Sequence, residues 1–132
     1  MSNWQKKVHI ESSMAKKEGQ WSLCIGRWQI LHDGHKQMFK QILDEGKNLL
    51  IGVRDGELDE KNPYTASEVM ANICKHYENN ILLGNVRVMI LPDICSINFG
   101  RGVGYDIVEY IPPSDIAEIS ATKIREEMKS SL

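Results

Sequence analysis

Apolar residues along the chain gather in short runs that alternate with amphipathic and turn-rich segments. Four runs predict strands, because each is short, apolar and bounded by glycine, proline or polar residues: Trp21–Gly26, Asn48–Val53, Val86–Leu91 and Tyr105–Ile111. Gly34–Glu45 carries apolar residues at helical spacing, and Gly46 follows as a helix stop. The pattern therefore starts as strand, helix, strand.

Two further segments carry signals for the start of a helix. Thr65 and Glu68 form the T-x-x-E pattern of a capping box, followed by apolar residues at helical spacing. Ser120 is suited to cap a last helix that runs to Met128. Strands that alternate with helices predict an α/β fold with a parallel sheet covered by helices. Ligands bind such sheets beyond the carboxyl ends of the strands, which directs attention to the loops there.

The first twenty residues differ from the rest of the chain. They are polar and charged with few apolar positions, so we expect residues 1–20 to be a solvated extension, helical near Ser13–Glu18, which can dock on the domain or on a partner. Residues 21–132 are expected to form the domain, since 132 residues suffice for a single compact one.

Composition and charge narrow the function classes. The 16 basic and 18 acidic residues give a net charge of −2, which argues against a protein that coats nucleic acid. No apolar run approaches the length of about 20 residues that a membrane span needs, and Met1–Gln20 lacks the apolar core of a signal peptide. Three scattered cysteines fit free thiols in a reducing compartment, so we expect a cytoplasmic protein.

The loop after the first strand reads G-R-W-Q-I-L-H-D-G-H, from Gly26 to His35. His32 and His35 lie three residues apart at a helix start, which places both imidazoles on one side. The unpaired N–H groups there favour a polyphosphate, and Gly26 permits close approach of a ligand. Fixed donors at that place suit nucleotidyl transfer. The alternatives are surface or capping histidines, or half of a metal site.

A second motif, I-S-A-T-K-I-R, spans Ile119–Arg125. Cations at a helix N-terminus oppose the helix dipole, so Lys123 and Arg125 are unfavourable there unless an anion binds. A bound phosphate would reverse that balance. The alternative is a serine cap followed by a solvated helix of mixed charge.

Together, in this order, the two motifs resemble the signatures of the HxGH nucleotidyltransferase superfamily. It includes adenylyltransferases that form dinucleotide cofactors and cytidylyltransferases for glycerol phosphate and choline phosphate. The resemblance spans about Ser22–Met128 and implies a Rossmann-like, doubly wound parallel sheet. It also implies a triphosphate bound with Mg²⁺, and assembly into homo-oligomers as is common in the family. No metal held by protein ligands alone, no nucleic acid and no membrane are expected.

The resemblance implies roles at matching positions. His32 and His35 match the histidines that stabilise the transition state, and Arg125 is counted with them as catalytic. The remaining matches are residues that contact the nucleotide or its phosphates: Gly26, Arg27, Trp28, Gly34, Ser120, Thr122 and Lys123. Trp28 has a second interpretation, since core packing explains a tryptophan here equally well.

The branch of the family is indicated by two stretches. G-R-W-Q is closer to the G-R-F-Q form of nicotinamide-mononucleotide adenylyltransferases than to the G-T-F-D form of cytidylyltransferases. K-N-P-Y-T-A, at Lys61–Ala66, is similar to K-N-P-F-T-A of the archaeal-type members. Ile30 departs from the usual proline, and the motif for the nicotinamide acceptor is not recognisable.

Three residues are candidates for binding the acceptor. Arg54 follows the second strand at the expected ligand edge, and Asn62 lies in the next loop. Arg101 belongs to the glycine-rich N-F-G-R-G-V-G-Y, which is interpreted either as a cover over the acceptor or as a turn. For Arg54 and Asn62 the alternatives are a solvated loop charge and a turn residue.

The sequence thus predicts transfer of an adenylyl group from ATP to a phosphorylated small acceptor, with release of pyrophosphate. One alternative is a cytidylyltransferase using CTP, favoured by the short chain and the I-S-x-T-K-I ending. Another is a nucleotide-binding module without catalysis, favoured by the missing acceptor motif. A metal-dependent hydrolase using both histidines is the third.

Overall fold

The computed structural model describes residues 4–12, 19–101 and 104–113. Among them no helix is long and apolar enough to cross a membrane. The helix predicted from Ser120, and the helical tendency near Ser13–Glu18, lie outside these residues.

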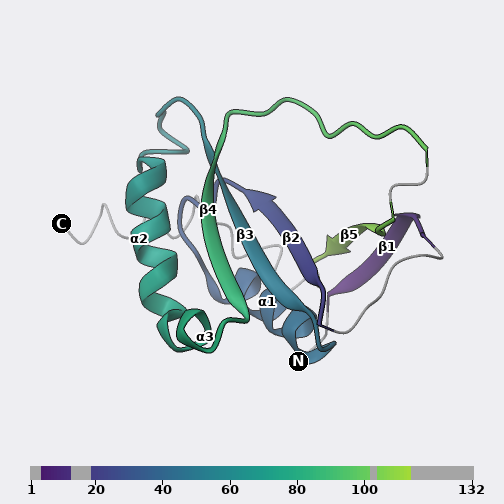
Figure 1. Cartoon of the computed structure of the whole chain (residues 1–132). Coiled ribbons are helices and arrows are strands. Elements are labelled where there is room, and N and C mark those ends of the chain that lie inside the picture. Colours follow the sequence, from purple (N-terminus) through teal and green to yellow (C-terminus); the bar gives the residue numbers. More distant parts are fainter. Residues whose placement is uncertain (1–3, 13–18, 102–103, 114–132) are drawn as a thin grey trace.

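A three-stranded parallel sheet forms the centre of the molecule. Its strands β2 (Trp21–Gly26), β3 (Asn48–Asp55) and β4 (Val86–Pro92) are neighbours in that order (Figure 1). They confirm three of the predicted strands to within two residues. Gly26 is opposite Val53, and Val53 is opposite Ile90, so the carboxyl ends of the strands lie together.

Two longer helices and a short one connect these strands. Helix α1 (Asp33–Asp44) follows β2, and helices α2 (Ala66–His76) and α3 (Glu78–Leu83) follow β3. The capping box predicted at the start of α2 is present: the Thr65 hydroxyl accepts from the Glu68 N–H at 3.1 Å, and the Glu68 carboxylate accepts from the Thr65 N–H at 3.1 Å. Helix α3 was not predicted.

The core lies between the sheet and these helices. Leu49, Ile51 and Val53 alternate along β3 and are fully buried on the helical face, with Phe39 and Ile42 of α1 and Ile73 of α2. Phe39 also meets the ring of Tyr77 at the end of α2, so α1 and α2 cover the same face. This is the expected Rossmann-like α/β arrangement. The other face carries the half-exposed Trp21, Leu23 and Met89, with no covering helix among the described residues.

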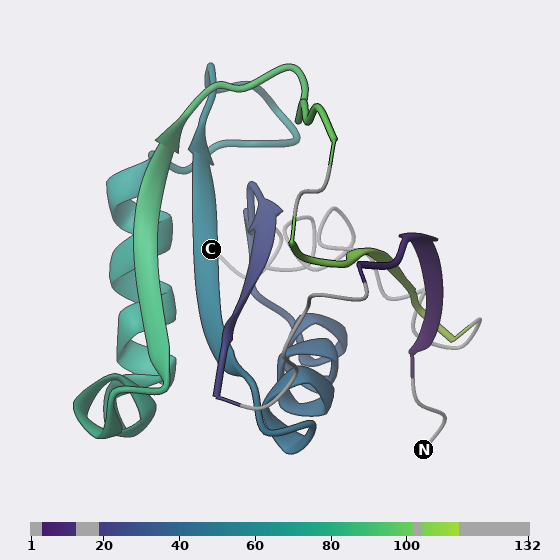
Figure 2. The ribbon, with the colours of Figure 1, turned by 45° about the vertical axis from the view of Figure 1, so that its right-hand side comes forward.

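A second, two-stranded sheet corrects the expectation that the four predicted strands form one parallel sheet. Strand β5 (Ile107–Ile111) forms where a strand was predicted, but it pairs antiparallel with β1 (Gln5–Ile10) and does not join the parallel sheet. The pair lies on the β2 side of the molecule (Figures 1 and 2).

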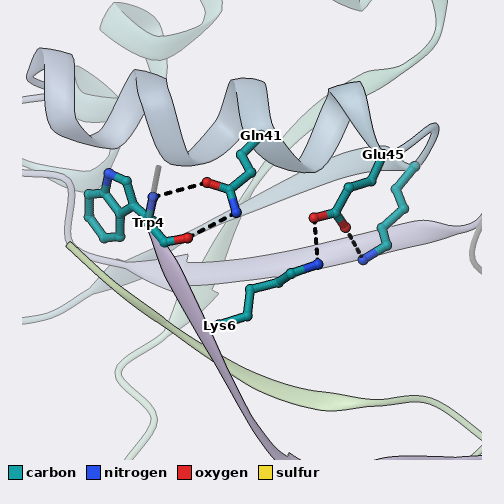
Figure 3. A network of polar contacts seen from close by, with 5 residues as sticks. Trp4, Lys6, Gln41 and Glu45 are labelled. Atoms are coloured by element: carbon teal, nitrogen blue, oxygen red, sulfur yellow. Dashed lines mark hydrogen bonds and ion pairs between the residues drawn. The ribbon is translucent and has the colours of Figure 1, made fainter. Parts of the chain in front are cut away.

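Of the first twenty residues, the described segment 4–12 docks on the domain, which is one of the two alternatives for this extension, and it forms a strand that was not predicted. Trp4 is buried, and its backbone N–H and C=O bind the Gln41 side chain at 3.1 and 3.0 Å (Figure 3). Lys6 contacts the Glu45 carboxylate at 2.7 Å. The strand carries no apolar periodicity because its side chains are almost all exposed, and its stability comes from backbone pairing and these contacts.

Candidate active site at the carboxyl end of the sheet

The predicted site loops meet at one edge of the sheet. The β2–α1 loop, the β3–α2 loop and residues 93–101 after β4 all leave the carboxyl ends of the parallel strands. Residues 93–101 run across the top of this edge in both views (Figures 1 and 2). The parallel connections therefore bring together segments that are far apart in the sequence.

Trp28 lies in the core and not in a position to stack on a ligand. Its side chain is 9% exposed, its φ is 48°, and its indole Nε1 donates to the Gly52 carbonyl oxygen at 3.0 Å. A Cβ on Gly26 would lie 2.8 Å from the indole ring. The nucleotide contact expected of Trp28 is thus corrected in favour of core packing. The absence of a side chain at Gly26 accommodates this ring.

His32 and His35 lie together at the start of α1. His32 is the N-cap, and its Nδ1 accepts from the His35 backbone N–H at 3.3 Å. In return, the His35 Nδ1 accepts from the His32 backbone N–H at 3.4 Å. The two rings stack with centroids 3.7 Å apart, and the edge of Trp28 supports His35 at 5.0 Å. Gly34, between the histidines, is buried in the first turn.

These contacts define what the two rings can offer a ligand. Because each Nδ1 accepts a backbone hydrogen bond, the proton of each neutral ring is on Nε2. Burial and the nearby His32 lower the pKa of His35 to about 4. Burial also lowers the pKa of His32, against the opposing effect of Asp33. At neutral pH both are neutral Nε2–H donors.

The two histidines therefore do cap the helix, as one of the alternatives predicted. The cap uses Nδ1 of each ring and leaves Nε2 outside it. No group of three or more His, Cys, Asp or Glu that could hold a metal occurs within the described ranges. His32 and His35 therefore have no third metal ligand beside them among the described residues.

The low pKa of His35 predicts how stability changes with pH. The unfolded chain takes up the proton near the ordinary value of 6.5, and the folded chain only near 4, so protons favour unfolding in this interval. We expect the melting temperature to fall as the pH is lowered from 7 towards 4. A smaller slope is expected for His35→Gln and an unchanged slope for His76→Gln. Thermal unfolding in a pH series measures both, and equal slopes in all three proteins would contradict the assignment.

Arg27 is held by the β3–α2 loop. Its guanidinium donates through Nη2 to the Glu57 carbonyl oxygen at 2.8 Å. It also packs on Gly56, where an added Cβ would overlap with Nη1. Backbone hydrogen bonding from Asn62, together with smaller contributions including the Arg27 charge, lowers the pKa of Asp59. Arg27 thus orders this loop, whatever further contact it makes.

Gln29 is the site residue to which the sequence assigned no role. Its side chain is 5% exposed, and its carboxamide binds the Tyr64 backbone N–H and C=O at 2.9 and 3.0 Å. The signal was its place inside the first motif, but no sequence spacing indicated the partner 35 residues away.

The three acceptor candidates differ in their surroundings. Arg54 donates through Nη2 to the Asp93 carboxylate at 3.0 Å and to the Ile94 carbonyl oxygen at 3.1 Å, so it fixes the start of residues 93–101. Asn62 donates its backbone N–H and Nδ2 to the Asp59 carboxylate at 2.7 and 3.1 Å, which supports the turn interpretation. Arg101 is exposed at the end of that segment.

The second motif lies outside the described residues. Ser120, Thr122, Lys123 and Arg125 therefore remain predictions, and the structure neither brings them to the histidines nor separates them from the site.

Comparison with known proteins adds to this geometry. Residues 23–85, which contain the β2–α1 and β3–α2 loops but not residues 93–101, match the cytidylyltransferase-like family model. Proteins named nicotinamide-nucleotide adenylyltransferase are similar to the chain. The one from Thermococcus sibiricus is 32% identical over 97 residues, covering 71% of this chain and 50% of the relative. The one from Methanococcus aeolicus is 32% identical over 108 residues, covering 80% of this chain and 59% of the relative. The chain thus spans about half the length of these curated relatives.

Proposed function

We propose that the chain is a nucleotidyltransferase that transfers an adenylyl group from ATP to a phosphorylated small molecule, because residues 23–85 match the cytidylyltransferase-like family model. The names of its relatives support adenylyl rather than cytidylyl transfer. The observation that carries the proposal is the pair of stacked histidines at the start of α1, each with Nδ1 engaged by the backbone and Nε2 outside the cap. A cytoplasmic location belongs to the same proposal.

In the proposed reaction, a phosphate oxygen of the acceptor attacks the α-phosphorus of ATP. The new P–O bond forms as the bond to the β-phosphate breaks, and the electron pair leaves with pyrophosphate. The nucleophile is already an anion, so no general base and no covalent enzyme intermediate are needed. Negative charge grows on oxygens at the α-phosphate and on the leaving group. The Nε2–H groups of His32 and His35 are the donors proposed to stabilise it, together with the N-terminus of α1.

The remaining phosphate contacts are proposed for residues of both motifs. Arg27 uses one N–H of Nη2 on Glu57, and its Nε is buried, so the remaining N–H groups of Nη1 and Nη2 are the donors proposed for a phosphate. The β- and γ-phosphates are proposed to bind Ser120, Thr122, Lys123 and Arg125, as the resemblance implies.

The donor set fits Mg²⁺ that enters with the nucleotide. The described ranges hold no metal-binding group of three His, Cys, Asp or Glu, and Mg²⁺ usually takes phosphate oxygens and water as most of its ligands. Bound in this way, the ion neutralises part of the triphosphate charge. The histidine pair and Arg27 would hold the triphosphate that carries the ion, through hydrogen bonds to its oxygens.

Pyrophosphate release tests the proposal. The purified chain is incubated with ATP, Mg²⁺ and nicotinamide mononucleotide, the first acceptor to try because it matches the names of the relatives. Parallel reactions contain CTP, or glycerol phosphate in place of the first acceptor. We expect release with ATP that depends on a phosphorylated acceptor. Binding of ATP without release across an acceptor panel would favour a module without catalysis, and release with CTP alone would favour the cytidylyltransferase.

The contact between Gly56 and Arg27 gives a second prediction. A methyl group at Gly56 displaces the far end of a flexible side chain, so Gly56→Ala is expected to change stability by less than about 1 kcal/mol. The same change displaces the Arg27 guanidinium, which is a proposed phosphate contact. We therefore expect ATP binding to weaken about tenfold, the effect of losing one charge-assisted hydrogen bond. Calorimetric titration measures this, with Gly100→Ala as the control because nothing lies within 4 Å of its added Cβ. Equal affinities in the two variants would remove Arg27 from the proposed phosphate contacts.

A further inference from the structure

Gln29 is a buried polar side chain that joins two loops of the site. It leaves the β2–α1 loop three residues before His32 and binds both backbone groups of Tyr64. Tyr64 directly precedes Thr65, the N-cap of α2. The carboxamide thus reproduces the pair of hydrogen bonds that a neighbouring strand would make. Its acceptor and one of its two N–H donors are used in this way.

The β3–α2 loop is held at both ends by neighbours of Trp28. Arg27 binds Glu57 near the beginning of the loop, and Gln29 binds Tyr64 at its end. Trp28, between them, is buried in the core with its Nε1 on Gly52. The segment that carries the histidines therefore carries two of the side chains that fix the second loop. If one loop moves, the other loop must move with it, or the hydrogen bonds of Arg27 and Gln29 break.

We propose that Gln29 is a positioning residue, which sets residues 61–65 and the start of α2 relative to the histidine pair. The inference rests on the proposed function, because its consequence is the placing of reactants bound between these loops. A misplacement of about 1 Å in such a site costs roughly a hundredfold in rate. Gln29 itself need not touch either reactant, since both its oxygen and one N–H are already engaged.

The chain supplies a matched control in Gln41. Its carboxamide makes the same two bonds to a single backbone unit, accepting from the Trp4 N–H at 3.1 Å and donating to the Trp4 carbonyl oxygen at 3.0 Å (Figure 3). These bonds join α1 to the residue before β1 and involve neither site loop. Gln29→Met and Gln41→Met therefore remove the same side-chain chemistry, one from the site and one from the N-terminal segment.

Amide hydrogen exchange of the full chain, monitored by NMR, tests whether Gln29 holds Tyr64 in place. The test does not depend on enzymatic activity. Gln29→Met is expected to speed exchange at Tyr64 about tenfold, because the Tyr64 N–H loses a part-buried hydrogen bond that protects it from opening. Gln29→Glu keeps an acceptor for the Tyr64 N–H and is expected to exchange at an intermediate rate. Gln41→Met should leave Tyr64 at the wild-type rate and speed exchange at Trp4. Wild-type exchange at Tyr64 in Gln29→Met would overturn the inference.

Kinetics then separate positioning from stability alone. At a temperature where both methionine variants are fully folded, Gln29→Met is expected to lower kcat for pyrophosphate release by about tenfold to a hundredfold. Gln41→Met should remain within about twofold, and Gln29→Glu should recover part of the loss. Equal kcat in Gln29→Met and Gln41→Met would overturn the positioning role. If the wild-type chain releases no pyrophosphate, the proposed function fails, and the exchange result still decides whether Gln29 holds the loop.

Discussion

Replacing His35 with alanine is expected to lower kcat for pyrophosphate release about a hundredfold or more, the usual cost of removing one preorganised donor. The donor lost is the Nε2–H, which the structure leaves outside the cap because Nδ1 accepts the His32 N–H at 3.4 Å. The loss should fall on kcat more than on the KM for ATP, because the developing charge exists only in the transition state. Steady-state kinetics with saturating acceptor measure it.

Two further variants separate chemistry from capping. His35→Gln keeps a side chain suited to the third position of a capping box, so its stability should stay near that of the wild type, while its activity falls. His76→Ala removes an exposed histidine from the last turn of α2 and should leave kcat unchanged. Wild-type turnover in His35→Ala would exclude this histidine from the reaction.

Trp28→Ala is expected to cost about 3–5 kcal/mol of unfolding free energy, the range for truncating a large buried aromatic side chain. The indole packs against His35 and Phe39 at 5.0 and 5.2 Å and binds Gly52 through Nε1. Its removal leaves a cavity next to His35 and removes the hydrogen bond from Nε1 to the Gly52 carbonyl oxygen. Denaturant unfolding measures the loss.

Trp21 supplies the control for this change. It is 41% exposed on the open face of the sheet, where its ring meets the Arg87 guanidinium at 4.7 Å. Trp21→Ala is expected to cost less than about 1.5 kcal/mol, because little area leaves the core and a half-exposed cation–π contact adds about 1 kcal/mol. A larger loss at Trp21 than at Trp28 would contradict the assignment of Trp28 to the core.

The central elements of the fold could be predicted because their signals are local. Continuous apolar runs identified β2, β3 and β4, and the capping box at Thr65 identified the start of α2. The spacing of His32 and His35 correctly placed both rings on one side of a helix start. Each of these signals depends only on residues within one turn or one strand.

What the sequence did not indicate depends on contacts between distant segments. Strand β1 is charged and exposed, so only its pairing with β5 distinguishes it from a solvated tail. The burial of Gln29 follows from a partner 35 residues away, and that of Trp28 from Gly52 on the next strand. Residue spacing carries no information on such pairs, because the sheet register that creates them is set by the whole core.

Calorimetric titration of ATP and of CTP, each with Mg²⁺, into the wild type and His32→Ala tests the central claim most directly. It needs no knowledge of the acceptor. If the histidine pair is the phosphate site of an adenylyltransferase, ATP binds the wild type more tightly than CTP and binds His32→Ala about tenfold more weakly, as expected for the loss of one hydrogen bond to an anion. Equal ATP affinity in the two proteins would show that the triphosphate is not held at the start of α1, and would contradict the account.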